Sequence, residues 1–276
     1  MSDTDPAAFR EFEHRGWQAI ASRYHDGFAG VTVQSIEPLL DAARVTVGTR
    51  LLDVACGPGY AAGAAARRGA IAVGLDFASE MVEEAKARYP AVEFREGDAE
   101  QLSFTDSFCD AVVSNFGMLH LGRPERALSE AYRVLRPSGR VAFTVWATPD
   151  KALGFAIVHA AIQKYGELNV PIPPGPPFFR FSDPDESRRA LAGAGFSDVV
   201  VTQVAQWWRL PSADALFEVI YHRSVRNAAL LRAQKPDALD AIRNEIRRGV
   251  ENYRNELPMP AVLASGVKAK PPESEQ

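Results

Sequence analysis

Cysteine is scarce in this sequence of 276 residues, which contains only Cys56 and Cys109. Two cysteines are too few for a disulfide framework, and neither stands at the spacing of metal ligands. The five histidines are scattered along the chain and do not form a metal set. The sequence therefore excludes a small disulfide-stabilised scaffold and predicts no metal centre.

Long apolar runs and an excess of positive charge are also missing. No stretch approaches the ~18 consecutive apolar residues of a membrane span, and no signal peptide opens the chain. The formal net charge is −4 and the sequence pI is about 5.8, which argues against a nucleic-acid partner that needs a basic surface. We expect a reduced, cytoplasmic protein with neither a nucleic-acid nor a membrane partner.

The rest of the chain is organised around the stretch Arg50–Gly69. Its apolar start, Leu51–Ala55, has the length of one buried parallel strand. The next four residues, Cys56-Gly57-Pro58-Gly59, allow a tight turn and the close approach of a ligand to bare backbone. An alanine-rich helix is expected over 60–68. Because the unpaired N–H groups and the dipole of this helix point into the crevice, the stretch predicts a ligand site.

Strands and helices alternate on both sides of this stretch. Helices are expected at 7–24, 35–44, 79–88 and 124–136, and further strands at 71–75, 92–95, 110–114 and 140–146. Strands that alternate with helices at this spacing predict a parallel, right-handed doubly wound sheet.

The second half of the sequence is less regular. We expect helices at 154–165 and 184–194, a polyproline-like loop at 170–177, strands at 198–210 and 259–267, and two helical patterns between 213 and 253. The chain is interpreted as a lid helix within 1–30 and one domain over 31–270, with substrate-pocket insertions at about 151–180 and 211–257. The first six residues and the tail after 267 are expected to be frayed or mobile.

The chemistry around the glycine turn indicates a nucleoside cofactor. Asp76 ends the second strand about 20 residues beyond the turn, where a carboxylate accepts hydrogen bonds from ribose hydroxyls. Residues 57–62 also satisfy a loose GxGxxA dinucleotide fingerprint, so an NAD-binding enzyme is an alternative. However, Pro58 removes a donor that a pyrophosphate would need, and Asp53 favours a cation over a phosphate. S-adenosylmethionine has a ribose and a positive charge but no phosphate, and it fits better.

Five segments resemble the class I S-adenosylmethionine-dependent methyltransferases, in particular the group similar to ubiquinone/menaquinone-biosynthesis methyltransferases (methyltransferase type 11). They are LLDVACGPG at 51–59, GLDFASEM at 74–81, GDAEQLSF at 97–104, FCDAVVSN at 108–115 and RVLRPSGR at 133–140. The resemblance covers about residues 15–150 strongly and the last two strands more weakly. It implies an α/β fold with a seven-stranded, mostly parallel, Rossmann-like sheet whose last strand is antiparallel.

The resemblance also implies roles for individual residues in binding S-adenosylmethionine. The methionine part would be held by Asp53 and the backbone around Ala55, Gly57 and Gly59, and the ribose by Asp76. Adenine would contact Phe77 or Met81 together with Asp98 and Ala99. Asn115 and Phe116 would line the floor near the methyl group, and Tyr24 of the lid helix would close over the cofactor. For Met81, a core position on an apolar helix stripe is an equal alternative.

A general base is needed only if the methyl acceptor must lose a proton. His120, after the fourth expected strand, and His222, in the second insertion, are the candidates, and a structural role is open for both. The aromatic content of the insertions predicts a small apolar or aromatic acceptor, without deciding between oxygen, carbon and nitrogen as the methylated atom. Two other functions stay open: a protein that binds S-adenosylmethionine without methylating, and a nicotinamide-dependent oxidoreductase.

Overall fold

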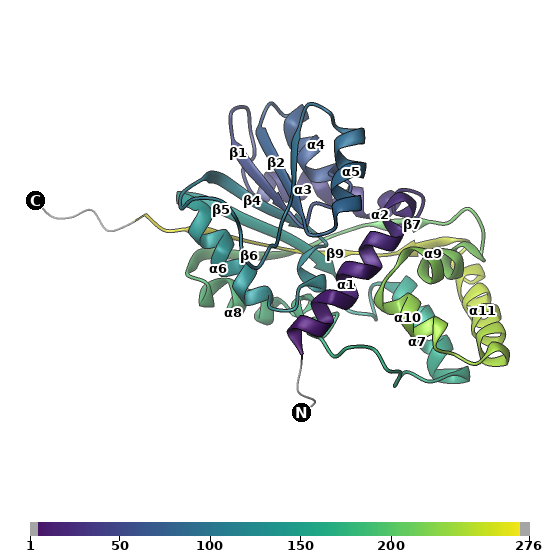
Figure 1. Cartoon of the computed structure of the whole chain (residues 1–276). Helices are drawn as coiled ribbons and strands as arrows, with labels where there is room; N and C mark the ends of the chain where they lie inside the picture. Colours follow the sequence, from purple (N-terminus) through teal and green to yellow (C-terminus); the bar gives the residue numbers. More distant parts are fainter. Residues whose placement is uncertain (1–4, 271–276) are drawn as a thin grey trace, which may run out of the picture.

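The structure is a computed structural model that describes residues 5–270. Residues 1–4 and 271–276, which hold most of the expected frayed start and mobile tail, lie outside the described residues. A seven-stranded sheet of order β3-β2-β1-β4-β5-β9-β6 runs through the centre of the molecule (Figure 1). Its strands are β1 (Arg50–Val54), β2 (Ile71–Asp76), β3 (Glu93–Glu96), β4 (Cys109–Asn115), β5 (Leu135–Trp146), β6 (Phe196–Val204) and β9 (Ala261–Lys268).

The direction of the strands confirms the expected doubly wound sheet. Strands β1 to β5 pair in parallel, whereas β9 runs antiparallel to both of its neighbours, β5 and β6. The strand order reverses at β1, because β2 and β3 lie on one side of it and β4 and β5 on the other. Such a reversal opens a crevice beyond the carboxyl ends of β1 and β4.

Helices cover both faces of the sheet. On one face, apolar side chains of α3 (Ile36–Ala42), α4 (Tyr60–Arg67) and α5 (Ser79–Arg88) share a buried cluster with Leu51. On the other face, those of α6 (Pro124–Val134) and α8 (Pro184–Gly193) share a cluster with Leu52. Successive strand residues point to opposite faces, so the continuous apolar run of β1 fills both layers of the core.

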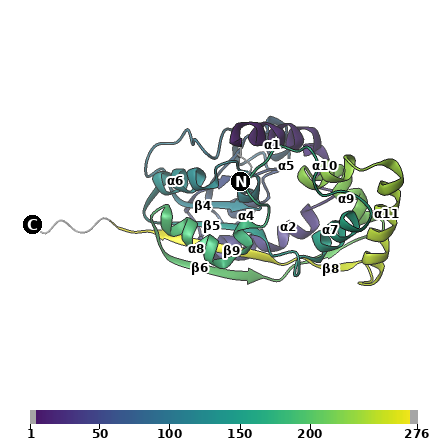
Figure 2. The same cartoon turned by 90° about the horizontal axis from the view of Figure 1, so that it is seen from below.

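A second group of helices lies beside the sheet (Figures 1 and 2). These cap helices are α7 (Leu153–Tyr165), α9 (Ala215–Arg223), α10 (Arg226–Arg232) and α11 (Pro236–Glu251). The sequence predicted two helical patterns after residue 213, but three helices form. The backbone at Ser224 is extended, with φ −125° and ψ 166°. Its hydroxyl donates to the carbonyl of Ile220 and accepts from the N–H of Ala228, which ends α9 and starts α10.

The expected strand over 198–210 is wrong as a single element. The chain leaves the main sheet after β6, and β7 (Trp207–Arg209) pairs instead with β8 (Glu256–Pro258). The break lies at the buried Gln206, whose side-chain amide donates to the carbonyl of Val31. The backbone carbonyl of Gln206 accepts from the N–H of Met259, so both hydrogen bonds of Gln206 lie outside the main sheet.

Helix α1 (Pro6–Ile20) crosses the molecule between α5 and the cap helices (Figures 1 and 2). Asp5 caps its start by accepting hydrogen bonds from the N–H groups of Ala7 and Ala8. A 3₁₀ turn, η1 (Ala21–Arg23), and the short helix α2 (Ala29–Thr32) then lead back toward the sheet. Among residues 5–270, no helix combines the length and the apolar character needed to span a membrane.

Candidate active site

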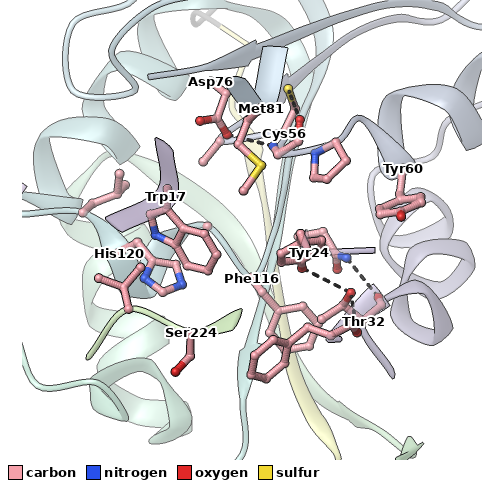
Figure 3. A pocket seen from close by; sticks show the side chains of 18 of the residues that line it. Trp17, Tyr24, Thr32, Cys56, Tyr60, Asp76, Met81, Phe116, His120 and Ser224 are labelled. Carbon is pink, nitrogen blue, oxygen red and sulfur yellow. Dashed lines mark hydrogen bonds between the residues drawn. The ribbon is translucent and has the colours of Figure 1, made fainter. Parts of the chain in front are cut away.

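A cavity opens at the crevice between β1 and β4. Its lining comes from α1 and the segment after it, from the glycine turn, from the ends of β2 and β4, and from the start of α10. Figure 3 shows side chains from these elements converging on one space. The cavity therefore lies where the reversal of strand order places a ligand site.

The glycine turn keeps its backbone accessible at one end of the cavity. Gly57 has φ +50°, and a Cβ atom added there would meet nothing within 4 Å. Gly59 has φ +79°, and an added Cβ would lie 2.6 Å from the ring of Phe94, so this glycine is required by packing. The carboxylate of Asp76 accepts hydrogen bonds from the N–H of Gly57 at 2.8 Å and of Ala78 at 3.0 Å. Asp76 thereby holds the turn at the end of β2.

Asp53 lies buried behind the turn, with 1% of its surface exposed. One carboxylate oxygen accepts from the N–H of Ala62 at 2.9 Å, and the other has no partner within residues 5–270. Burial raises the pKa of Asp53 to about 7, the bond from Ala62 lowers it, and the charge of Asp76 raises it further. A buried carboxylate oxygen without a partner is costly, so a donor or a cation that reached it would stabilise the charge.

Asp98 and Ala99 line a smaller cavity that shares Phe77 and His120 with the first one. One oxygen of Asp98 accepts from the N–H of Glu100 at 2.9 Å. The other forms a 3.1 Å ion pair with Arg10 of α1. The two cavities adjoin at the end of β2, and α1 contributes to the walls of both.

The opposite end of the main cavity is aromatic. Five rings form an aromatic wall there: Phe28, Phe116, Trp146, Phe155 and Phe178. The ring centroids of Phe116 and Trp146 are 4.1 Å apart, those of Trp146 and Phe155 5.3 Å, and those of Phe155 and Phe178 5.4 Å. Such a wall suits a flat, apolar molecule.

Two polar side chains lie at the edge of the aromatic wall. The amide of Asn115 donates to the carbonyl of Thr32 at 3.0 Å, and its oxygen accepts from the hydroxyl of Thr144 at 2.7 Å. The hydroxyl of Tyr24 lies 3.4 Å from that of Thr32. Burial raises the pKa of Tyr24 to about 12, so its hydroxyl stays protonated at neutral pH.

A buried charged cluster joins α1 to the cap helices beside the cavity. Glu13 of α1 is fully buried, and one of its oxygens forms a 2.7 Å ion pair with Nε of Arg226 on α10. The other oxygen lies 2.9 Å from Nδ1 of His120 and accepts from the indole N–H of Trp17. His120 ends the 3₁₀ turn η3 (Met118–His120), which follows β4. Trp17, His120 and Arg226 all line the cavity.

Comparison with known proteins identifies the part of the chain that carries the glycine turn. The profile of a family described as "methyltransferase domain" matches residues 52–143. Demethylmenaquinone methyltransferase of Renibacterium salmoninarum is 37% identical over 111 residues, which are 40% of this chain and 47% of that protein. Residues 52–143 belong to the class I methyltransferases.

Relatives and structures beyond this segment extend the comparison. The 2-phytyl-1,4-naphthoquinone methyltransferase of Synechocystis sp. is 34% identical over 171 residues, which are 58% of this chain and 62% of that protein. The chain spans about half the length of the curated relatives that it matches. Phosphoethanolamine N-methyltransferase 2 of Haemonchus contortus has a TM-score of 0.58 at 20% identity, over 96% of this chain and 61% of its own. At this identity, the structural likeness shows the shared fold alone.

The fold brings most of the sequence-predicted site residues to the main cavity. Those that line it are Tyr24, Ala55, Gly57, Asp76, Phe77, Met81, Asn115, Phe116 and His120. Asp98 and Ala99 line the adjoining cavity, whereas Asp53 and Gly59 line neither of the two. His222 is not brought to the site: it does not line the cavity, and its exposed ring lies 3.4 Å from Glu218 on α9.

Sequence reasoning missed Glu13 and Arg226: the fold places Arg226 in the cavity wall and Glu13 directly behind it, paired with Arg226. Arg226 carried no signal that separated it from the other arginines. Glu13 did carry one, because it lies four residues from both Phe9 and Trp17, on the apolar stripe of the first helix. An acid on a face that must be buried requires charged or hydrogen-bonding partners, and here these come from distant parts of the chain.

Proposed function

We propose that this protein transfers a methyl group from S-adenosylmethionine to a small apolar or aromatic molecule with a quinone-like ring. The observation that carries the proposal is a single cavity, bounded by the glycine turn at one end and by the aromatic wall at the other. The printed names of two relatives, demethylmenaquinone methyltransferase and 2-phytyl-1,4-naphthoquinone methyltransferase, each contain a quinone. Solved structures with this fold include complexes with S-adenosylhomocysteine and with S-adenosylmethionine.

The donor set at the turn fits this cofactor. Gly57 leaves open space against its backbone, and the unpaired oxygen of Asp53 suits the positively charged methionine part. Asp76 retains lone pairs for ribose hydroxyls beyond the two N–H groups that it already accepts. When bound, S-adenosylmethionine supplies an electrophilic methyl group on a sulfonium. The proposal keeps the cofactor contacts expected for Tyr24, Ala55, Gly59, Phe77, Met81, Asp98, Ala99, Asn115 and Phe116.

The other residues of the cavity would align the acceptor and keep water away from it. Methyl transfer gains most from alignment of the reacting atoms in a dry site. The aromatic wall would hold a flat ring, and α1 would act as the lid over both ligands. His120 lines the cavity and would serve as the general base for an acceptor that must lose a proton.

The experiment is an assay for S-adenosylhomocysteine and methylated product. The purified protein is incubated with S-adenosylmethionine and 2-prenyl-1,4-naphthohydroquinone kept reduced, within a panel of aromatic acceptors. Gly57→Val should abolish cofactor binding, because the added side chain fills the open space at the turn. Gly48→Val is the matched control, because Gly48 has φ +79° and equally open space in an exposed turn away from the cavity.

Three results would contradict the proposal. Binding of S-adenosylhomocysteine in calorimetry without product from any acceptor would favour a protein that binds the cofactor and does not methylate. Binding of NADH in place of S-adenosylmethionine would favour an oxidoreductase. Equal effects of Gly57→Val and Gly48→Val on cofactor affinity would remove the glycine turn from the binding site.

A further inference from the structure

Glu13 is a fully buried acid whose carboxylate is surrounded by hydrogen-bond donors. It accepts from Trp17 at 3.0 Å and from Nε of Arg226 at 2.7 Å, and Nδ1 of His120 lies 2.9 Å away. Burial alone raises the pKa of Glu13, but the charges and hydrogen bonds of His120 and Arg226 together outweigh it and lower the pKa. Glu13 is therefore an ionised carboxylate at neutral pH.

This carboxylate determines which nitrogen of His120 carries a proton. An ionised carboxylate can only accept hydrogen bonds, so Nδ1 of His120 must be the donor. In the neutral imidazole, Nε2 is then free of a proton. Within residues 5–270, Nε2 makes no hydrogen bond, and the ring lines the cavity next to Trp17 (Figure 3). The ring of His120 also makes an edge contact with Phe178. The unprotonated nitrogen is thus available to a ligand in the cavity.

Arg226 is the second partner that holds the Glu13 carboxylate in place. Its guanidinium donates to Glu13, to the carbonyl of Pro176 at 2.9 Å and to the carbonyl of Leu119 at 2.6 Å. It also lies over the ring of Phe9, 4.3 Å from the centroid. The 2.7 Å ion pair with Arg226 therefore gives Glu13 a cationic partner other than His120.

We propose that Glu13 is a positioning residue, which holds His120 with Nδ1 protonated so that Nε2 acts as the base toward a hydroxyl group on the acceptor. This inference rests on the proposed function and deepens it, because it assigns the acceptor to ring compounds with an ionisable hydroxyl. The acceptor O–H bond breaks, its electron pair stays on the acceptor, and the proton forms a bond to Nε2. The imidazolium so formed is stabilised by Glu13. Since Glu13 lies on α1, the base is complete only while this helix covers the cavity.

The test is the tautomer of His120, measured by NMR on protein labelled with ¹⁵N-histidine at pH 8 in complex with S-adenosylhomocysteine. The His120 signals are assigned by their loss in His120→Gln. The wild type should show a protonated Nδ1 and an unprotonated Nε2. Glu13→Gln should lower the ratio of the Nδ1–H to the Nε2–H form about tenfold, the effect of losing one charged hydrogen bond. Glu11→Gln, an exposed acid on the same helix, should leave the ratio unchanged.

Turnover of 2-prenyl-1,4-naphthohydroquinone provides the second measurement. Glu13→Gln should lower kcat by roughly 10²-fold, within the range of general base catalysis, while affinity for S-adenosylhomocysteine changes only a few-fold. A wild-type His120 that is protonated on Nε2, a ratio that Glu13→Gln leaves unchanged, or an unchanged kcat despite the altered ratio would each overturn the inference. If Glu13→Gln does not fold, the wild-type tautomer alone decides. If S-adenosylhomocysteine binds and the ratio changes but no hydroquinone is methylated, the proposed acceptor fails and the positioning role of Glu13 stands.

Discussion

Replacing the buried Asp53 by asparagine should stabilise the cofactor-free protein, and increasingly so as the pH rises. Asp53 is 1% exposed, and one oxygen of its carboxylate has no hydrogen-bond partner within residues 5–270. Ionisation of such a group in the folded protein is opposed by burial and by the neighbouring charge of Asp76. Asparagine has a similar shape and can still accept from Ala62, but it does not ionise.

The pKa of Asp53 fixes the pH range and the size of the effect. Its pKa of about 7 in the folded protein lies above the ordinary 3.8. Between these two pH values, Asp53 is therefore protonated in the folded protein and ionised in the unfolded chain. The free energy of unfolding of the wild type therefore decreases as the pH rises through this range. From these two pKa values, the ionisable Asp53 lowers the free energy of unfolding of the wild type by roughly 4 kcal/mol at pH 8 and by roughly 2 kcal/mol at pH 5. An unpaired asparagine N–H would reduce the gain by about 1–3 kcal/mol at every pH.

Urea unfolding of the wild type and of Asp53→Asn at pH 5 and pH 8 measures this difference. The stability gap between the two proteins should be wider at pH 8 by about 2–3 kcal/mol, whatever the constant contribution of the amide. Asp150→Asn, an exposed turn residue, is the matched control and should show no such change. A gap that is the same at both pH values would refute the reasoning. We also expect Asp53→Asn to bind S-adenosylmethionine more weakly, because stability and cofactor binding make opposite demands on this carboxylate.

Two further substitutions test the turn and the charged cluster. Asp76→Ala should weaken binding of S-adenosylhomocysteine by about 1–3 kcal/mol, the scale of charge-assisted hydrogen bonds; unchanged affinity in calorimetry would remove Asp76 from the site. Arg226→Met should lower the free energy of unfolding by about 3–5 kcal/mol at neutral pH, because it removes one partner of a buried ion pair and leaves Glu13 without the arginine, whereas the exposed Arg232→Met on the same helix should have little effect. The loss should shrink in acid: the lowered pKa of Glu13 means that its stabilising contribution is present above 4.5 and lost as the pH falls through the folded value. Equal losses for the two arginine variants in urea unfolding would contradict the role of the buried pair.

The sequence by itself determined the elements whose signals are local. Helix α5 has the bounds Ser79–Arg88 that the apolar period and flanking residues predicted. The turn at residues 56–59 was predicted from its glycines, because Gly57 and Gly59 adopt the positive φ that favours glycine and a Cβ at Gly59 would meet the ring of Phe94. Alternation of strands and helices then determined the doubly wound sheet, since parallel strands need crossover connections. The resemblance to class I methyltransferases likewise depended on contiguous segments of the chain.

The tertiary structure alone decided which distant side chains meet. Glu13 and Arg226 are far apart in the sequence, and the pattern of neither helix specifies the other as its partner. His120 and His222 were equivalent candidates by residue type, yet docking of the cap helices leaves His222 on an exposed face and His120 in the cavity wall. The strand expected over 198–210 divides at Gln206 because the partners of that residue, Val31 and Met259, come from remote segments. Periodicity reports which face of one element is buried, but the partner of that face depends on how the elements pack together.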